Sequence, residues 1–326
     1  MTPNQKIIFT SHGGPEVLRL VSEELGDPSS DEVMIKHEAI GVNFVETYFR
    51  SGLYKTTLPS GLGTEAAGKV VKVGSNVSEF KVGDRVAYAQ GPLGSYSVRR
   101  NIPARYLVKI PPGVTMEEAA GGLLKGLTVY YLFHETYPLK KGQTILFHAA
   151  AGGVGLIACQ WAKHLGVKLI GTVSTPEKAH LAKNNGASEI INYSIENVPE
   201  RVVEFTSGKK VPVVYDGVGK STWEMSLDSL APRGLLVSFG NASGPVTNVD
   251  LGILSQKGSL YVTRPILATY MDTPEKLQEG ASEVFNLISE KKIHIAVDRK
   301  FKLEEASLAH EYIANRNSMG STILIP

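Results

Sequence analysis

The 326-residue chain contains a single cysteine, Cys159. Without a second cysteine no intrachain disulfide can form, and nothing in the cysteine usage points to an oxidising compartment. The cysteine and the histidines are not spaced like the ligands of a metal. Because Cys159 lies within an apolar helical pattern, LIACQWAKHL, we expect it to be a packing residue.

Long hydrophobic runs are also absent. No apolar stretch approaches the ~18 residues that a membrane-spanning helix needs, and MTPNQKIIFTSHGGPEVLRL has no apolar core of the signal-peptide kind. Neither sign of charge predominates, since 34 Lys and Arg residues stand against 32 Asp and Glu residues, a formal net charge of +2. Such a balance argues against nucleic acid or a membrane surface as the main partner. We therefore expect a soluble, cytoplasmic protein.

The composition is that of a globular protein, with 42% hydrophobic and 20% charged residues, and the length suits two domains. Up to about Pro112, short strand-like runs such as GKVVKVGSNV and GDRVAYA alternate with glycine-containing turns. This pattern predicts an all-β domain. The next segment, EEAAGGLLKGLTVYYLFHETY, has apolar residues at helical spacing and is expected to form a bridging helix.

From Gln143 onward, apolar strand-like runs alternate with amphipathic helical stretches. The runs are TILFH, KLIGTV, EIINY, PVVYD, GLLVSFG and GSLYV. Continuous apolar strands separated by helices predict an α/β fold with a doubly wound, six-stranded parallel sheet. After about Arg264 the chain returns to mixed helix and strand, and its closing run STILIP is expected to pair back onto the first domain.

The run TILFH leads into a glycine-rich turn, AAAGGVG, and then a helix. Compared with the dinucleotide-binding pattern G-x-G-x-x-G, Ala150 replaces the first glycine, whereas Gly152 and Gly155 keep the other two. The kept positions are those where the backbone approaches a pyrophosphate and where the helix packs closely on the strand. Free N–H groups and the dipole at the helix start favour an anion. A tight turn without a ligand is the alternative, which the flanking strand and helix disfavour.

The next run ends in GTVSTPEK, where NAD-binding domains carry an acidic residue for the ribose 2′-hydroxyl. Here the run ends at Ser174, and Lys178 follows one helical turn later. A serine and a lysine would hold a 2′-phosphate, whereas a carboxylate would repel it. Tyr193, at the end of EIINY, can offer its hydroxyl to the same phosphate. The sequence thus predicts NADPH as the cofactor.

The run GQTILFHAAAGGVGLIACQWAK is similar to the signature of NADPH:quinone oxidoreductases, the zeta-crystallin branch of the medium-chain dehydrogenase/reductase superfamily. The resemblance extends over essentially the whole chain and includes GVNFVETYFRSGLY, GTEAAGKVVKVGSNV, LLKGLTVYYL, VVYDGVG, LLVSFGNASG and GSLYVTRP. It implies a discontinuous GroES-like β domain made of residues 1–125 and 265–326. The inserted residues 126–264 would form a Rossmann domain that binds NADPH.

The resemblance also implies that the enzyme works without zinc. Zinc-dependent relatives place a catalytic cysteine in the segment that here reads GVNFVE, and a histidine after the glycine of GTE. This chain has Asn43 and Thr64 in these segments, although Glu65 is kept. It also lacks the four-cysteine structural lobe of those relatives.

Site residues follow from the resemblance, position by position. Those expected on the active-site cleft, with catalytic roles, are Asn43, Tyr48, Tyr54 and Arg264. Those expected to bind the cofactor are Asn43, Thr128, Gly152, Gly153, Val154, Ser174, Lys178, Tyr193, Phe239, Gly240, Asn241, Arg316 and Asn317. The two tyrosines of the cleft depend mainly on the resemblance, because the chain has 13 tyrosines and any one of them is more often a packing residue.

The segment GSLYVTRP resembles the family's last Rossmann strand, which can pair with its copy in a second subunit. An exposed edge strand would otherwise favour aggregation. We therefore expect a two-fold homodimer through the edge strand near Gly258–Val262.

The expected reaction is hydride transfer from NADPH to a quinone without a metal. The reduced oxygens could take their protons from water or from a tyrosine. Asn43 and Arg264 are expected to hydrogen-bond the accepting carbonyl or the nicotinamide amide. Reduction of an α,β-unsaturated aldehyde or ketone is the enzymatic alternative, and the residues themselves do not separate the two. A non-enzymatic role as an RNA-binding or crystallin-like structural protein is a third hypothesis. The near-neutral charge argues against RNA binding as the main role.

Overall fold

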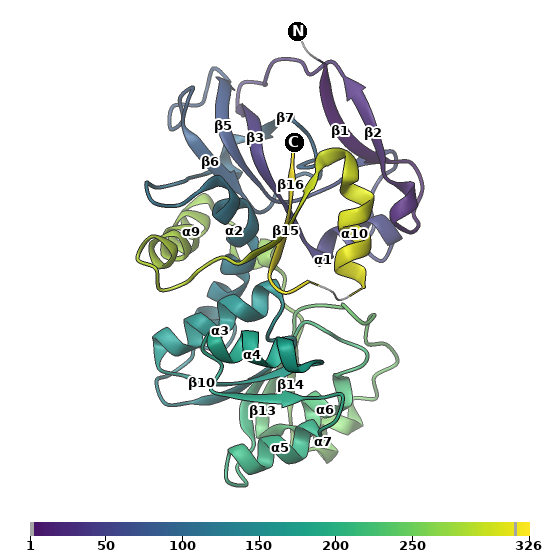
Figure 1. Ribbon diagram of the computed structural model, residues 1–326, viewed down its shortest axis with the longest axis vertical. Helices are drawn as coiled ribbons and strands as arrows, with labels where there is room; N and C mark the ends of the chain where they lie inside the picture. Colours follow the sequence, from purple (N-terminus) through teal and green to yellow (C-terminus); the bar gives the residue numbers. More distant parts are fainter. Residues whose placement is uncertain (1–2, 316–317) are drawn as a thin grey trace. The chain divides into compact units, whose positions relative to one another are not determined.

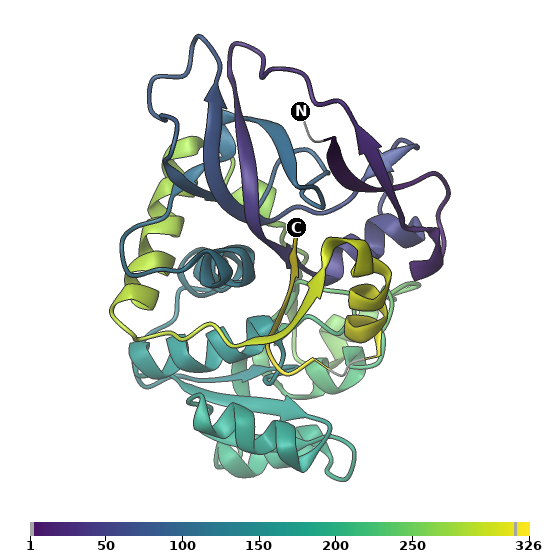
Figure 2. The same cartoon turned by 45° about the horizontal axis from the view of Figure 1, so that its top comes forward.

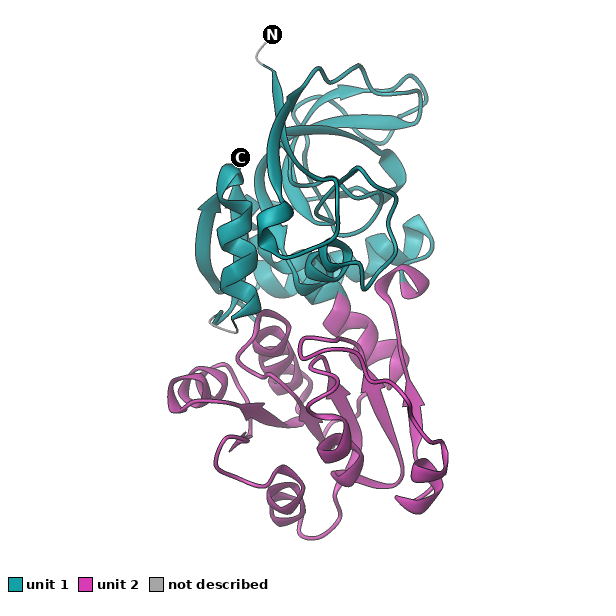
Figure 3. Cartoon of the chain, turned by 90° about the vertical axis from the view of Figure 1, so that its right-hand side faces the viewer, with its two compact units in different colours: residues 1–127, 271–326 teal, residues 128–270 magenta. Residues whose placement is uncertain are grey.

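The computed structural model describes residues 3–315 and 318–326 (Figure 1). Arg316 and Asn317, two of the expected cofactor residues, therefore lie outside the described residues. The chain divides into two compact units, residues 1–127 with 271–326 (unit 1) and residues 128–270 (unit 2) (Figure 3). Each unit has its own hydrophobic core.

Unit 1 contains two sheets. The larger has seven strands in the order β15-β16-β3-β5-β6-β8, with β7 paired to β3, and the smaller has the order β2-β1-β4. The strands are β1 (Asn4–Phe9), β2 (Arg19–Glu23), β3 (Glu32–Val42), β4 (Ser60–Gly61), β5 (Ala66–Val73), β6 (Arg85–Tyr88), β7 (Arg99–Pro103), β8 (Val108–Lys109), β15 (Val297–Lys302) and β16 (Ser321–Ile325).

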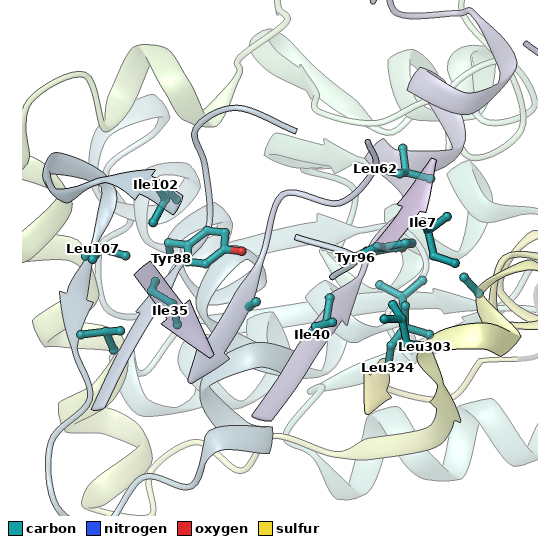
Figure 4. Packing of buried hydrophobic residues seen from close by; sticks show 14 of the residues in the cluster. Ile7, Ile35, Ile40, Leu62, Tyr88, Tyr96, Ile102, Leu107, Leu303 and Leu324 are labelled. Carbon is teal, nitrogen blue, oxygen red and sulfur yellow. The ribbon is translucent and has the colours of Figure 1, made fainter. Parts of the chain in front are cut away.

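Strand β3 is the common partner of this larger sheet, since it pairs with β5, β7 and β16. Along its middle, Lys36 and Glu38 are exposed whereas His37 and Ala39 are buried, the alternation of a strand with one face on a core. Side chains from β1, β3, β6 and the loop before β7 fill that core (Figure 4).

As predicted, the C-terminal run returns to the first part of the chain. Strand β16 pairs antiparallel with β3, placing Ile323 opposite Gly41 and Leu324 opposite Ile40. Strand β15 lies parallel to β16 at the edge of the sheet (Figure 2). Between them the chain forms η4 (Leu303–Glu305) and α10 (Ala306–Ala314).

The prediction that the first domain is all-β was wrong at one helix, α1 (Phe44–Ser51). Asn43 is its N-cap, and the Glu46 carboxylate accepts the Asn43 backbone N–H in a capping box. The helix ends at Gly52, whose φ of 81° lies in the left-handed region that glycine adopts without strain. An Asn with Glu three residues later is a helix-start signal, so this helix could have been predicted from the sequence.

The remaining helical segments of unit 1 are short, apart from α9. They are η1 (Pro15–Val17), η2 (Ala104–Tyr106) and α9 (Pro274–Ser289). The expected bridging helix is confirmed as α2 (Met116–Tyr131), which continues as a π-helical turn, η3 (Leu132–Thr136). Residues of α2 up to Leu127 belong to unit 1.

Unit 2 confirms the predicted doubly wound sheet. Six strands in the order β11-β10-β9-β12-β13-β14 make five parallel pairings. They are β9 (Thr144–Phe147), β10 (Lys168–Val173), β11 (Glu189–Asn192), β12 (Val211–Asp216), β13 (Leu230–Ser238) and β14 (Tyr261–Thr263). The intervening helices are α3 (Gly153–Leu165), α4 (Pro176–Asn184), α5 (Val198–Phe205), α6 (Trp223–Asp228), α7 (Gly252–Gln256) and α8 (Leu267–Tyr270), the last of which follows β14.

Strand order in unit 2 reverses beside β9, because β10 and β11 continue to one side and β12, β13 and β14 to the other. Right-handed crossovers then place α3 and α4 on one face of the sheet and α5, α6 and α7 on the opposite face (Figure 1). In open parallel sheets, ligands bind outside the carboxyl ends of the strands at such a reversal. Within the described residues, no helix is both long and apolar enough to cross a membrane.

Candidate functional site

The carboxyl edge of the unit 2 sheet gathers most of the expected cofactor residues. Pairing of Val173 with Asn192 brings Ser174 and Tyr193 together just beyond the ends of β10 and β11. Pairing of β12 with β13 and of β13 with β14 brings three more positions to the same edge. These are Gly217 after β12, Phe239 after β13 and Arg264 after β14. Thr128 lies in α2, where it is buried.

Close packing at the glycine turn confirms the role predicted for Gly155. A Cβ there would meet the Ala149 carbonyl oxygen and come within 2.7 Å of the Ala150 backbone. The replaced first glycine is explained by the neighbouring strand. Ala150 is fully buried. A Cβ added to Gly171 of β10 would lie only 2.6 Å from the Cβ of Ala150, which is too close. A glycine on the adjacent strand therefore accommodates the alanine in the turn.

The start of α3 is suited to an anion. Gly152 is the N-cap and has no side chain to satisfy the first N–H groups of the helix. Those groups belong to Gly153, Val154 and Gly155, and with the helix dipole they form an anion site. A Cβ on Gly152 would lie 3.3 Å from the Ala149 carbonyl oxygen, so the glycine keeps this approach open. The cradle fits a pyrophosphate.

The two residues directly after β10 are Ser174 and Thr175, neither of which is acidic, and Glu177 lies in the first turn of α4. Thr175 caps α4, and its hydroxyl accepts the Lys178 backbone N–H at 3.3 Å. Ser174 and Lys178 are both half-buried, and Tyr193 is 38% exposed. The Tyr193 backbone N–H donates to the Val173 carbonyl at 3.1 Å, which ties the two strand ends together. Residues with hydroxyl and ammonium groups therefore follow the ends of β10 and β11, where NAD-binding domains carry an acid.

Under the glycine turn lies a buried chain of polar side chains. His148 Nδ1 is 2.9 Å from the Thr172 hydroxyl, and His148 Nε2 is 3.0 Å from the Ser226 hydroxyl. Ser226 in turn donates to Asp216 at 2.8 Å. Burial lowers the pKa of His148, although the Asp216 carboxylate opposes this, so the ring is neutral. The chain links the ends of β9, β10 and β12 and thereby fixes the turn.

Arg264 is occupied by backbone carbonyls. Its Nη1 donates to the Ser238 carbonyl at 2.7 Å and to the Gly240 carbonyl at 2.9 Å. With the Asn241 amide oriented to satisfy its neighbours, Asn241 Oδ1 accepts from Arg264 Nη2 at 2.9 Å. The guanidinium therefore holds the loop Phe239–Asn241 in place.

A second polar group lies wholly within unit 1 and centres on Asn43. Lys125 Nζ donates to Asn43 Oδ1 at 2.7 Å, and Asn43 Nδ2 donates to Glu65 Oε2 at 2.9 Å. Lys125 Nζ is also 3.7 Å from Glu65 Oε2. All three residues are buried, with 6% of Asn43, 6% of Lys125 and none of Glu65 exposed. We call Asn43, Glu46, Glu65 and Lys125 the Asn43 cluster.

Glu65 and Glu46 anchor the cluster to the backbone. Glu65 Oε1 accepts the Leu124 backbone N–H at 2.6 Å. Glu46 Oε1 accepts both the hydroxyl of Thr64, at 2.7 Å, and its backbone N–H, at 3.2 Å. Burial raises the pKa of Glu46 to about 7 despite these hydrogen bonds, and it also raises the pKa of Glu65 against the opposing effect of Lys125.

Tyr48 and Tyr54, the two tyrosines expected on the cleft, contact each other. The rings of Tyr48 and Tyr54 meet edge to face, with centroids 5.2 Å apart. Tyr48 is buried on α1 and Tyr54 is half-buried just after it, which creates an aromatic surface on the same helix that Asn43 caps.

Lys125, Glu46 and Glu65 were not among the predicted site residues. A signal for Lys125 was available, because it is the one charged residue in the apolar helical run GGLLKGLTVYYL. A lysine in the middle of such a run must either reach solvent or find buried partners. Which partners it finds depends on β3 and β5 and is not visible in the sequence.

The chain is similar to known protein families and to individual known proteins. Residues 29–112 match the family described as alcohol dehydrogenase GroES-like domain, and residues 153–286 match the family described as zinc-binding dehydrogenase. The chain is 61% identical to a quinone oxidoreductase of Pseudomonas aeruginosa over 323 residues, which cover 99% of both chains.

Two further similarities bear on chemistry. The solved structure of Escherichia coli quinone oxidoreductase complexed with NADPH has a TM-score of 0.98 and 56% identity, covering 99% of this chain and 100% of that one. A 2-haloacrylate reductase of a Burkholderia species is 43% identical over 329 residues, covering 98% of each chain.

The raised pKa of Glu46 predicts a specific pH dependence of stability. Between the ordinary value of 4.5 and about 7, the folded protein holds a proton on Glu46 that the unfolded chain has lost. The free energy of unfolding therefore falls as pH rises through this window, and it stays constant with respect to Glu46 above it. Relative to Glu46→Gln, the free energy of unfolding of the wild type should fall by up to about 3 kcal/mol between pH 4.5 and about pH 7.

Urea unfolding of both proteins across this range of pH measures the effect. Glu279→Gln, at an exposed position of α9, is the control and should show no pH-dependent difference from the wild type. Comparing variants cancels the contribution of the buried histidines, which all three proteins share. If the difference in the free energy of unfolding between Glu46→Gln and the wild type does not change with pH, the raised pKa of Glu46 is contradicted.

Proposed function

The chain belongs to the quinone oxidoreductases of the medium-chain dehydrogenase/reductase superfamily, and on this premise we propose that it reduces quinones by hydride transfer from NADPH. The observation that most supports NADPH as the cofactor is the sequence after β10, where Ser174 and Lys178 occur in place of an acid at the end of the strand. Tyr193 from β11 lies beside them. The 61% identity to a quinone oxidoreductase carries the acceptor class.

Bound NADPH supplies the hydride, and the protein supplies binding and orientation. The N–H groups at the start of α3 hold the pyrophosphate, and Ser174, Lys178 and Tyr193 hold the 2′-phosphate. Arg264 acts as a positioning residue, because its hydrogen bonds go to the loop carbonyls and fix Phe239–Asn241. That loop is assigned to the nicotinamide side of the cofactor. Arg316 and Asn317 remain cofactor candidates outside the described residues.

For the acceptor, the relevant groups are in unit 1. Tyr48 and Tyr54 provide an apolar aromatic surface that suits a flat ring. Asn43 has one amide proton committed to Glu65 and a second available for a carbonyl oxygen, which would stabilise developing negative charge.

We also propose that no zinc takes part. Asn43 Oδ1, a side-chain oxygen in the segment where zinc-dependent relatives place a cysteine ligand, accepts a hydrogen bond from the Lys125 ammonium at 2.7 Å. An ammonium at that distance would repel a divalent cation. Thr64, in the segment of the second ligand, donates its hydroxyl proton to Glu46.

A second candidate function is reduction of an activated carbon–carbon double bond, which the 43% identity to a 2-haloacrylate reductase favours. That reaction needs a hydride at one carbon and a proton at the next. Both candidates use the same cofactor and the same cleft, so they differ only in the acceptor.

The exposed edge of the unit 2 sheet supports a homodimer as part of the proposal. Strand β14 is the last strand of the sheet, with Tyr261 60% and Val262 38% exposed. Pairing of two β14 strands about a two-fold axis would satisfy the open edge.

Val262→Lys should therefore sediment as a monomer, whereas the control Leu308→Lys, at a 50% exposed position of α10, should sediment like the wild type. Dimeric Val262→Lys would exclude this interface.

A cytoplasmic location is part of the same proposal. It is supported by the absence of any second cysteine to pair with Cys159, which is itself buried. Cell fractionation that recovers the protein with a periplasmic or membrane marker would refute it.

The choice of cofactor can be tested at Lys178. Loss of one charge-assisted contact of about 1.5–3 kcal/mol should raise KM for NADPH by roughly ten- to a hundredfold in Lys178→Ala. KM for NADH should stay unchanged, because NADH has no 2′-phosphate. Lys183→Ala, on the same helix but paired with Glu189, is the matched control and should leave both values unchanged. An equal rise for both cofactors would show that Lys178 does not bind the phosphate.

The acceptor class can be tested with a panel. Initial rates of NADPH oxidation should be highest with ortho- and para-quinones, and lower with 2-alkenals, 2-enones and 2-haloacrylates. NADH in place of NADPH should give lower kcat/KM with every acceptor. Turnover confined to the unsaturated acids or carbonyls would replace the quinone proposal by the second candidate.

A further inference from the structure

The ammonium of Lys125 is a buried cation with unused hydrogen-bonding capacity. One of its three protons goes to Asn43 Oδ1, and the group faces Glu65 Oε2 at 3.7 Å. Residues 3–315 and 318–326 offer it no further acceptor within hydrogen-bond distance. Only 7% of the side chain is exposed, so bulk water does not replace the missing partner.

The position of this ammonium is fixed from several directions. Asn43 accepts from it, and the Asn43 amide is itself oriented by its hydrogen bond to Glu65. Glu65 is held in turn by the Leu124 backbone N–H, from the residue before Lys125 in α2. A flexible side chain is thereby held as an oriented donor, which is the arrangement that stabilises a developing oxyanion.

Burial of the charge is costly for the fold. Removing an ammonium from water costs several kcal/mol, and a single carboxylate partner recovers this only with good geometry. Two apolar residues of similar volume would stabilise a fold at least as well. A desolvated charge that is held in place but has a free donor is typical of a functional group.

We propose that the Lys125 ammonium binds the carbonyl oxygen of the acceptor and donates the proton that quinone reduction consumes. The assignment rests on the proposed function for its substrate class. When the quinone accepts the hydride, it gains two electrons and carries one negative charge on oxygen. The N–H bond of Lys125 breaks, an O–H bond forms on the acceptor, and the neutral amine takes a proton from water. Each hydroquinone thus consumes one NADPH and one solvent proton.

Within the Asn43 cluster we assign the proton transfer to Lys125. An amide such as Asn43 can donate a hydrogen bond but does not release a proton. Glu46 can carry a proton up to about pH 7, but both of its oxygens are engaged by the Asn43 backbone N–H and by Thr64, whereas Lys125 has N–H bonds that no partner among the described residues uses. An ammonium that touches the developing phenolate oxygen of the acceptor can pass a proton to it. Glu65 is a positioning residue that also neutralises the charge of Lys125.

Kinetics and a spectroscopic probe test the proposal together. Lys125→Met should lower kcat for quinones by roughly 10²–10³-fold, while the dissociation constant for NADPH, measured by fluorescence, stays unchanged. The wild type should bind 4-nitrophenol as its phenolate and show the visible phenolate band, and Lys125→Met should bind it as the neutral phenol. Lys125→Arg should keep the phenolate band yet stay slow, because a guanidinium stabilises the anion without donating a proton.

Controls separate charge loss from misfolding. Lys300→Met removes an exposed lysine of β15 that pairs with Glu117 of α2, the helix that carries Lys125. This variant should behave like the wild type. If Lys125→Met does not fold because Glu65 is left unpaired, Lys125→Met/Glu65→Gln removes both charges and should fold, bind NADPH and remain slow.

Two results would overturn the proposal: wild-type kcat in the double variant, or a phenolate band in Lys125→Met as strong as in the wild type. The probe does not depend on turnover. A wild-type protein that reduces no quinone but shows the Lys125-dependent band would refute the proposed function while supporting Lys125 as the oxyanion site.

Discussion

A buried ammonium needs a counter-charge and fixed neighbours, and the architecture of unit 1 is arranged to provide both for Lys125. Glu65 supplies the counter-charge from the residue before β5, and Asn43 links the two from the start of α1. Space for the Glu65 carboxylate exists only because β3 carries Gly41 there. A Cβ at that position would collide with Glu65 Oε2 and with the Ala120 carbonyl of α2. Helix start, strand glycine and helix interior therefore all depend on the same ion pair.

In unit 2 the governing constraint is the parallel sheet, which sends every carboxyl end to one edge. That edge collects backbone N–H groups at α3, hydroxyl and ammonium groups beyond β10 and β11, and the loop held by Arg264. The division of labour is clear in chemical terms. On the proposed function, unit 2 would provide donors for phosphate oxygens, and unit 1 would provide a desolvated cation and an aromatic surface for an uncharged acceptor that becomes negative during reduction.

The sequence was informative wherever the signal was local. The six strand-like runs of unit 2, the glycine turn and the acid-free strand tip are all contiguous patterns, and the structure has them as strands, turn and tip. Helix α1 was missed although N-x-x-E at Asn43–Glu46 is a local signal, because the surrounding turn-rich pattern favoured strands. The Asn43 cluster was beyond prediction, since Lys125 lies 82 residues from Asn43 and their contact depends on tertiary packing. Ala150 is a similar case, because its tolerance depends on Gly171 in the neighbouring strand.

The central claim is that an ammonium, in place of a metal ion, provides the positive charge for reducing the acceptor. The most direct test is the NADPH–quinone rate of protein purified without added metal, measured before and after treatment with a strong chelator, together with its metal content by mass spectrometry. We expect no stoichiometric zinc and an unchanged rate. A rate that falls on chelation and returns on addition of zinc would contradict it.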